Sequence, residues 1–379
     1  MNIQATLQML AAQPYTEQPF LSLYLDWMPD GNGKRQAPRI VEQELNRIAD
    51  RLAERGADLD GFEADRRRIA DYLARGAPAD AHSLAIFACA AEGVWVTLPL
   101  QAPIETEIAE DRYPHLFLLA ELLDDYETYA VVLADGQESR IFVITLDAAE
   151  QVGETEATEE IKRFKSGKAQ ENYLFQHRTD NIIRAHTKDI ASQLGQIMAR
   201  YDVRHVVIAA NDAIKGIVMD TLPDAIKERL VDYVHLDSGA NAQAVLDEID
   251  PLIRQVEREQ EAAAVAKLEE QAYPDGLGVV GISDTAQALS KGQVQMLIMG
   301  RNFESAGGVC PHCGALRAGH RQRCPYDGAE LRPVDLREAF TARAIQQNSA
   351  IEIVEVSEYL DQHEGVGALL RYRDNARTA

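Results

Sequence analysis

The chain has 379 residues, of which 46% are hydrophobic, 26% are charged and 6% are aromatic. This length predicts two or three domains with real cores, and the composition excludes a disordered or fibrous protein. The formal net charge of −23 excludes general attraction to the phosphates of DNA, so any contact with nucleic acid must be local.

No stretch reaches the roughly 18 apolar residues that a membrane-spanning helix needs, and the first residues lack the features of a signal peptide. We therefore expect a cytoplasmic protein with no membrane partner. Three of the four cysteines crowd into residues 310–324, which favours metal binding in a reducing compartment, whereas Cys89 is expected to be a buried thiol.

Residues 1–125 are expected to form a mixed α/β domain. FLSLYLDW alternates as a half-buried strand does, and SLAIFACA with VWVTLPL predicts a strand pair interrupted at Glu92-Gly93. Two helices are expected between them, the first with an apolar face and a stop at Gly56. Its predicted apolar positions are Val41, Leu45, Ile48 and Leu52.

Residues 126–270 are expected to form a second α/β domain. YAVVLA and SRIFVITL predict a hairpin across Asp135-Gly136, followed by the acidic patch GETEATEE and a basic segment. A long helix and the buried strand VRHVVIAA come next, in an order typical of a crossover between parallel strands. A further helix is expected to begin at Asp250-Pro251 and to run through Gln271.

The basic segment reverses the charge of the chain. From Lys162 to Lys188 it holds seven Lys or Arg against two acids. Such runs are often solvated surface, but this one lies between strands and a helix, where loops carry function, so we expect it to contact RNA. The candidate RNA-binding residues are Lys162, Arg163, Lys165, Gly167, Lys168, Gln170 and Arg178, together with Lys34 and Arg35 of the first domain.

Residues 271–379 alternate strands and helices, which predicts a small α/β sandwich with a cysteine module at 308–332 inserted in a loop. CPHCG and CPYDG form paired knuckles with spacing suited to one tetrahedral ion, and zinc is the natural choice. The expected ligands are Cys310, Cys313, Cys324 and Asp327, with His312 or His320 as substitutes for the last. A structural site is favoured over a catalytic one, and a metal-free turn is the alternative.

Conventional catalytic motifs are absent from the sequence, including GxSxG, the P-loop and HExxH. Hydrolysis of a nucleotide is therefore disfavoured. His177 and His186 have no identifiable Ser or Cys partner, so we expect polar or RNA-facing roles for them.

The closing residues AIEIVEVSEYLDQHEGVGALLRY resemble the C-terminal signature of archaeo-eukaryotic class 1 release factors and Pelota. The hairpin, basic loop and long helix of the middle region also resemble that superfamily, in particular its bacterial branch of Balon-like ribosome hibernation factors. The resemblance implies three α/β domains and a monomer bound to ribosomal RNA at the A site and the peptidyl-transferase centre. It allows an elongation-factor GTPase as a further partner. No counterpart of the stop-codon-reading motif lies in residues 1–125.

The catalytic loop departs from the family pattern. Release factors carry Gly-Gly-Gln there, whereas this chain has Gly167-Lys168-Ala169-Gln170. Loss of the second glycine restricts the backbone and displaces the glutamine. The favoured hypothesis is a non-enzymatic hibernation or ribosome-protection factor. The alternative is a hydrolase that rescues stalled ribosomes through Gln170, and a weaker possibility is binding to a protein or RNA elsewhere.

Overall fold

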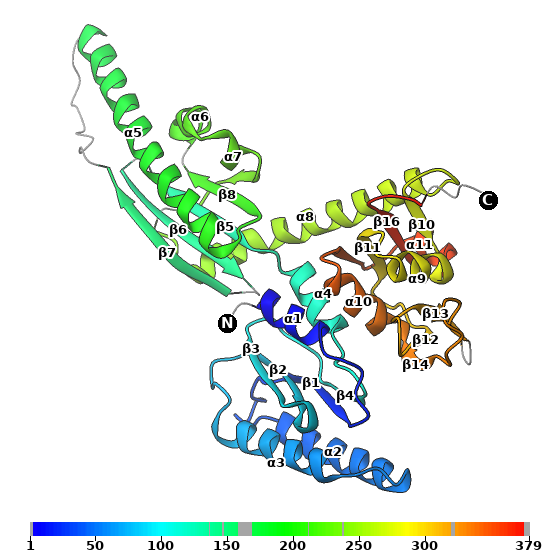
Figure 1. Cartoon of the computed structure of the whole chain (residues 1–379). Helices are drawn as coiled ribbons and strands as arrows, with labels where there is room; N and C mark the ends of the chain where they lie inside the picture. The colour runs from blue at the N-terminus through cyan, green and yellow to red at the C-terminus, as the bar shows by residue number, and fades with distance from the viewer. Residues whose placement is uncertain are drawn as a thin grey trace. The chain divides into compact units, whose positions relative to one another are not determined.

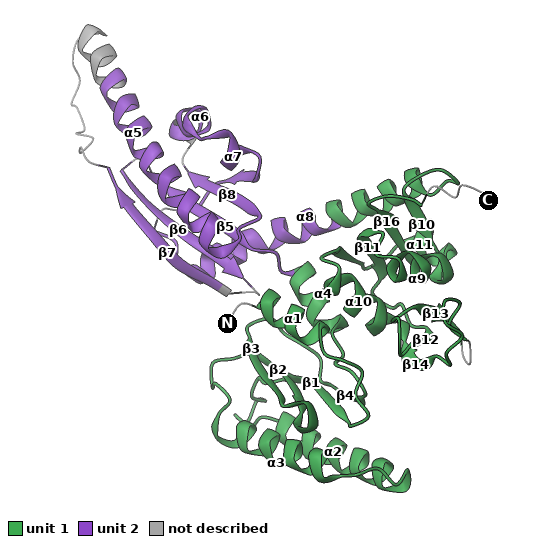
Figure 2. Cartoon of the chain, in the orientation of Figure 1, with its two compact units in different colours: residues 1–125, 259–379 green, residues 126–258 purple. Residues whose placement is uncertain are grey.

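The computed structural model describes residues 3–135, 137–145, 148–157, 169–210, 212–236, 239–319 and 323–374. The chain divides into two compact units, one of Met1–Asp125 with Glu259–Ala379 and one of Tyr126–Arg258 (Figures 1 and 2). Several sheets and many helices confirm the mixed α/β class. The division into three domains stays a prediction, because the first and third predicted regions share one compact unit. Among the described residues, no helix combines the length and apolar character needed to cross a membrane.

The N-terminal part of the first unit is an antiparallel sheet in the order β3-β2-β1-β4. The predicted apolar face of the helix Ala37–Glu54 is buried as expected. Gly93, between β2 and β3, adopts a φ of 68°. Its strands are β1 (Phe20–Asp26), β2 (Ser83–Cys89), β3 (Val94–Leu100) and β4 (Glu107–Asp111). Its helices are α1 (Ile3–Ala11), α2 (Ala37–Glu54), α3 (Asp60–Arg75), the 3₁₀ turn η1 (Ala90–Glu92) and α4 (Phe117–Asp125).

Strand β1 corrects the expectation of a half-buried strand. All its residues except Asp26 are buried. Leu21 and its alternate neighbours pack with α2 and α3. On the other face, the main chain of His115 crosses the strand, donating to Ser22 Oγ at 3.0 Å and accepting from Tyr24 Oη at 2.9 Å. Both faces are therefore covered.

The C-terminal part of the first unit is a sheet in the order β10-β16-β11-β15, in which β11 and β15 are parallel. The predicted order of strands and helices is confirmed. Its elements are β10 (Gly278–Val280), α9 (Ile282–Ser290), β11 (Val294–Gly300), α10 (Leu336–Gln346), β15 (Ala350–Val354), α11 (Glu358–Gln362) and β16 (Val366–Leu370).

The cysteine module lies between β11 and α10 and has its own antiparallel sheet in the order β13-β12-β14. Close packing at its centre needs glycine, because a Cβ on Gly307 would lie 2.4 Å from the carbonyl oxygen of Arg317. The strands are β12 (Ala306–Val309), β13 (Leu316–Ala318) and β14 (Arg332–Asp335).

The second unit is built on a five-stranded sheet in the order β7-β6-β5-β8-β9. The predicted hairpin β5–β6 and the buried strand β8 are confirmed, and β8 pairs in parallel with β5. The elements are β5 (Tyr129–Ala134), β6 (Glu138–Thr145), β7 (Ala148–Glu156), α5 (Ala169–Tyr201), β8 (His205–Ala210), α6 (Asp212–Thr221), α7 (Asp224–Lys227), β9 (Leu230–Val234) and α8 (Ala242–Gln271), whose last residues belong to the first unit.

One strand of this region was not predicted, and the start of one helix was predicted wrongly. Part of the acidic patch is the edge strand β7, which pairs with β6 and exposes much of its surface, so glutamates are tolerated there. The helix expected to begin at Asp250-Pro251 begins at Ala242, where Asn241 Oδ1 accepts the NH of Ala244 at 2.9 Å. Pro251 lies inside that helix.

Candidate functional site

The first knuckle of the cysteine module follows β12. The NH of Cys310 donates to the carbonyl oxygen of Ala315 at 2.9 Å, and the carbonyl of Cys310 accepts the NH of Gly314 at 2.9 Å. Gly314 turns the chain with φ 69°, a conformation that favours glycine. This turn directs the NH groups of His312 and Cys313 at Cys310 Sγ, at 3.4 and 3.5 Å.

The second knuckle repeats this geometry. The NH of Cys324 donates to Ala329 at 2.8 Å, and Gly328, with φ 73°, donates to the carbonyl of Cys324 at 2.9 Å. The NH of Tyr326 points at Cys324 Sγ at 3.4 Å. The repeated CPxxG sequence therefore folds into two equivalent turns, each of which aims main-chain NH groups at a sulfur.

The two knuckles bring the four predicted ligands together. The ligand atoms of Cys310, Cys313, Cys324 and Asp327 all lie within 4.8 Å of one another. Cys313 Sγ lies 3.5 Å from Cys324 Sγ, and Cys310 Sγ lies 3.4 Å from Asp327 Oδ2. Sulfur ligands ~2.3 Å from a tetrahedral ion lie ~3.8 Å apart, so the cluster fits one ion of that size. These four residues can hold a metal ion.

Two of the four ligands, Asp327 and Cys310, already favour the negative charge that a cation needs, and Cys324 does not. The NH of Ala329 and the Cys324 thiol lower the pKa of Asp327 to about 2. At Cys310, desolvation raises the pKa, but the NH groups of Cys313 and His312 outweigh it, and the pKa is lowered. Desolvation raises the pKa of Cys324 to about 11. A bound divalent cation would favour its thiolate, as it does for coordinating thiols in general.

The two histidines proposed as substitute ligands have different positions. His312 Nδ1 lies 3.1 Å from Asp327 Oδ2, so it contacts the carboxylate from outside the four-donor cluster. His320 lies outside the described residues. From helix α10, Arg343 Nη2 donates to the carbonyl of Gly314 at 2.5 Å and fixes the first knuckle.

The basic loop is the second candidate site, and most of it lies outside the described residues. This applies to Lys162, Arg163, Lys165, Gly167 and Lys168. Helix α5 begins at Ala169, so the main chain of Gln170 and of Arg178 is helical. The basic segment from Lys162 to Lys188 is therefore helical from Ala169 onward.

The other candidate RNA-binding residues lie far apart in the sequence and differ in environment. Arg178 is exposed on α5, and Lys34 is exposed in the loop before α2. Arg35 is held by the fold. Its guanidinium donates to the carbonyl oxygens of Trp27 at 2.8 Å and Ala79 at 2.7 Å, and it stacks 4.9 Å from the Trp27 ring centroid.

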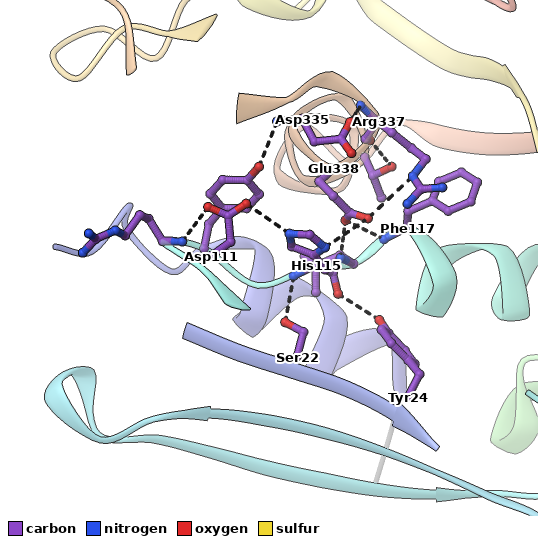
Figure 3. Close-up of polar contacts among 12 residues, drawn as sticks. Ser22, Tyr24, Asp111, His115, Phe117, Asp335, Arg337 and Glu338 are labelled. Atoms are coloured by element: carbon purple, nitrogen blue, oxygen red, sulfur yellow. Dashed lines mark hydrogen bonds and ion pairs between the residues drawn. The ribbon is translucent and has the colours of Figure 1, made fainter. Parts of the chain in front are cut away.

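Sequence reasoning missed a buried polar network in the first unit (Figure 3). Glu338 of α10 is 2% exposed, and its Oε2 accepts the NH groups of Leu116 at 2.5 Å and Phe117 at 2.9 Å, at the start of α4. His115 Nε2 lies 3.2 Å from Asp111 Oδ2. Despite desolvation, which lowers it, the pKa of His115 is raised by Asp111 and Glu338.

The far end of α4 is held by a second ion-pair cluster. Arg301, just after β11, contacts both carboxylate oxygens of Asp125 at 2.7 Å, and its Nε lies 2.9 Å from Glu121 Oε1. The NH of Ile353 donates to Asp124 Oδ2 at 2.6 Å. No sequence pattern links partners so far apart, so only the fold reveals both clusters.

Comparison with known proteins places these features in a family. Residues 114–254 match the model of bacterial archaeo-eukaryotic release factor family 10. This match covers 141 of the 379 residues and supports the resemblance of the chain to the bacterial branch of archaeo-eukaryotic release factors. No curated protein sequence matches the chain.

Several solved structures are similar at low identity. The archaeal translation termination factor aRF1 is 15% identical, with 97% of this chain and 96% of that chain covered and a TM-score of 0.25. Pelota of Archaeoglobus fulgidus is 14% identical over 77% of this chain and 79% of that chain, with a TM-score of 0.34. Dom34 of S. cerevisiae, a translation termination-like factor, is 12% identical over 75% and 76%, with a TM-score of 0.43.

Proposed function

We propose that this release-factor-like protein binds the A site of the ribosome and protects an idle ribosome without cleaving peptidyl-tRNA. The family match at residues 114–254 supports a role in translation. In this proposal, residues 1–125 face the decoding centre and the basic segment 162–178 contacts ribosomal RNA near the peptidyl-transferase centre. Local positive charge lets an acidic protein make that contact.

One observation carries the non-catalytic part of the proposal, namely the helical main chain of Gln170 at the start of α5. Release factors of this superfamily present their glutamine after two glycines. Here Lys168 and Ala169 precede Gln170, and a residue in a helical turn cannot adopt the conformations that glycine allows. The main chain at Gln170 therefore lacks the conformational freedom with which release factors present their glutamine to peptidyl-tRNA.

A peptide-release assay on ribosomes carrying peptidyl-tRNA tests this part. We expect the wild-type chain to release no more peptide than buffer, and Gln170→Ala to behave in the same way. A true release factor serves as the positive control. Release by the wild type that disappears in Gln170→Ala would instead establish the alternative function, rescue of stalled ribosomes by hydrolysis.

Co-sedimentation with ribosomes tests binding. Replacing Lys162, Arg163, Lys165 and Lys168 with Glu should abolish co-sedimentation at moderate salt, because each lost phosphate contact removes part of the electrostatic attraction. A matched variant carries the same four-charge reversal at Arg200, Arg254, Arg258 and Lys267 and should still bind. Equal binding by both variants would show that the loop is ordinary surface.

We further propose that the ion of the cysteine module is a structural zinc. Three thiolates and one carboxylate suit its preference for tetrahedral sulfur and oxygen ligands. When bound, zinc would crosslink the two knuckles and stabilise the β12–β14 sheet. All four positions are filled by protein, so the site offers no open position for catalysis.

A further inference from the structure

A pocket of 110 Å³ lies within the first unit, between the segment after α1, the chain before α4, the β12–β14 sheet and α10. Most of its walls are apolar, including Val309, Leu316 and Ala342. This pocket is smaller than the dry cavity of about 150 Å³ that holds benzene, so it suits a branched chain of about four carbon atoms or part of a small ring.

The charge of the pocket is opposite to that of the chain. Asp and Glu account for 61 of the 379 residues, so an average set of twelve residues would include about two acids. The twelve residues that line the pocket include no acid and one cation, Arg343. An anion entering here would meet a positive charge and no carboxylate among the lining residues, although the charge of Asp111 acts on the lining residues Tyr15 and Tyr113.

Arg343 differs from the other arginines around it in having no carboxylate partner among the described residues. Arg301 pairs with Asp125, and Arg332 pairs with Glu17. The contact that the structure records for Arg343 is one hydrogen bond from Nη2 to the carbonyl of Gly314. Its other NH groups remain as donors, and burial lowers the pKa of its guanidinium, although the neighbouring Cys313 acts to raise it.

Four further polar side chains line the same pocket, namely those of Gln13, Tyr15, Tyr113 and Gln346. The Tyr15 side chain is half-buried there, with its ring centroid 6.0 Å from that of Tyr113, and its hydroxyl makes no hydrogen bond within the described residues. Gln346 Nε2 donates to the carbonyl of Ala11 at 2.6 Å and closes the wall between α10 and α1. The Tyr15 hydroxyl and the remaining NH groups of Arg343 are therefore the donors that the pocket offers to a ligand.

We propose that this pocket binds a small monocarboxylate with an apolar body, held at its carboxylate by Arg343 and Tyr15. A planar carboxylate matches the fork of a guanidinium, and the apolar walls favour a hydrocarbon body over a phosphate with its hydrated oxygens. The site lies next to the first knuckle, because Arg343 also fixes Gly314. It uses no residue of the basic loop and is independent of the proposed ribosome contact.

Titration of the full chain with benzoate, followed by saturation-transfer NMR at constant ionic strength, tests the proposal. Benzamide is the neutral probe of the same shape. We expect the wild type to bind benzoate at least tenfold more tightly than benzamide. Equal affinity for the two probes, or no binding of benzoate, would overturn the proposal.

Variants identify the site. Arg343→Gln should weaken benzoate binding at least tenfold, and Ala342→Leu, which fills the pocket but keeps the cation, should abolish it. Arg323→Gln removes an exposed charge from the same module and should bind as the wild type does. If Arg343→Gln does not fold, Arg343→Lys, which should retain measurable binding, and Ala342→Leu replace it. Unchanged binding by Ala342→Leu would place benzoate elsewhere and reject the pocket.

Discussion

Glu338 Oε2 accepts a hydrogen bond from the main-chain NH of Phe117 at 2.9 Å, although the two residues are 221 positions apart in the sequence. The same oxygen accepts the NH of Leu116. One carboxylate thus caps the first turn of α4, and Phe117 packs in the core of the C-terminal sheet. A single side chain of α10 therefore ties the N-terminal part of the first unit to its C-terminal part.

Replacing this carboxylate should separate the roles of hydrogen bonding and charge. Glu338→Ala leaves two buried NH groups without an acceptor and should lower the free energy of unfolding by about 2–4 kcal/mol. Glu338→Gln keeps an oxygen for both NH groups and removes an ion whose pKa is raised by burial, so its loss should be under about 1 kcal/mol. Urea unfolding measures both.

Glu330→Ala, at an exposed position in the cysteine module, should change stability little and serves as the control. Equal losses for Glu338→Ala and Glu338→Gln would mean that the negative charge, rather than the acceptor oxygen, holds α4 in place.

Substitutions of the ligands in the cysteine module should change how much metal it binds and how fast it releases the metal. Cys313→Ser should reduce the bound zinc per chain well below one equivalent, because it removes one of three thiolates. Asp327→Cys should retain one equivalent and release it more slowly to a chelator, because a fourth thiolate replaces a carboxylate. Elemental analysis and a chelator-competition assay measure the two effects.

Cys89→Ala is the matched control, since Cys89 is a buried thiol in β2 outside the module. Full metal content in Cys313→Ser would contradict the proposed ligand set. Faster release of zinc from Asp327→Cys than from the wild type would show that this site holds the ion better with a carboxylate than with a fourth thiolate.

Local patterns predicted much of the fold. The β-branched run of β8 and the apolar spacing along α2 each correspond to a buried face, because the period of burial is written in consecutive residues. Strand β7 was missed because its glutamates lie on an exposed edge, where pairing with β6 supplies the order that hydrophobicity does not. The start of α8 was missed because Pro251 resembled a helix start.

The candidate sites also differed in how far the sequence could predict them. The CPxxG turns could be predicted because each knuckle is a local motif and the spacing alone brings the ligands together. The partner of His115 and the cap of α4 could not, because Glu338 reaches them only after the chain has folded. Lys34 and Arg35 looked alike in sequence, and only packing separates them.

Stability of the first unit should depend on pH through Glu121. Desolvation raises the pKa of Glu121 from 4.5 to about 6, against the attraction of Arg301. A raised acid pKa means that the folded state holds its proton longer than the unfolded state, so this group favours folding less as pH rises from 4.5 through 6. Glu121→Gln removes that dependence.

We therefore expect the free energy of unfolding of the wild type to fall relative to Glu121→Gln across this pH range and to level off above it. Urea unfolding at several pH values gives the comparison. Glu358→Gln, far from Arg301 in sequence and on the exposed α11, is the control. Parallel pH profiles for wild type and Glu121→Gln would show that Arg301 fully compensates the burial.

Arg35 and Lys34 should respond differently to the same truncation. Arg35→Ala removes two hydrogen bonds to main-chain carbonyls and the stacking on Trp27, so it should lower the free energy of unfolding by about 1–3 kcal/mol. Lys34→Ala removes an exposed side chain and should change stability by less than about 0.5 kcal/mol. If the loop before α2 contacts ribosomal RNA, Lys34→Ala should weaken co-sedimentation with ribosomes while the protein stays as stable as the wild type. This prediction assigns a structural role to Arg35 and none to Lys34. A loss of stability in Lys34→Ala, or no loss in Arg35→Ala, would contradict it.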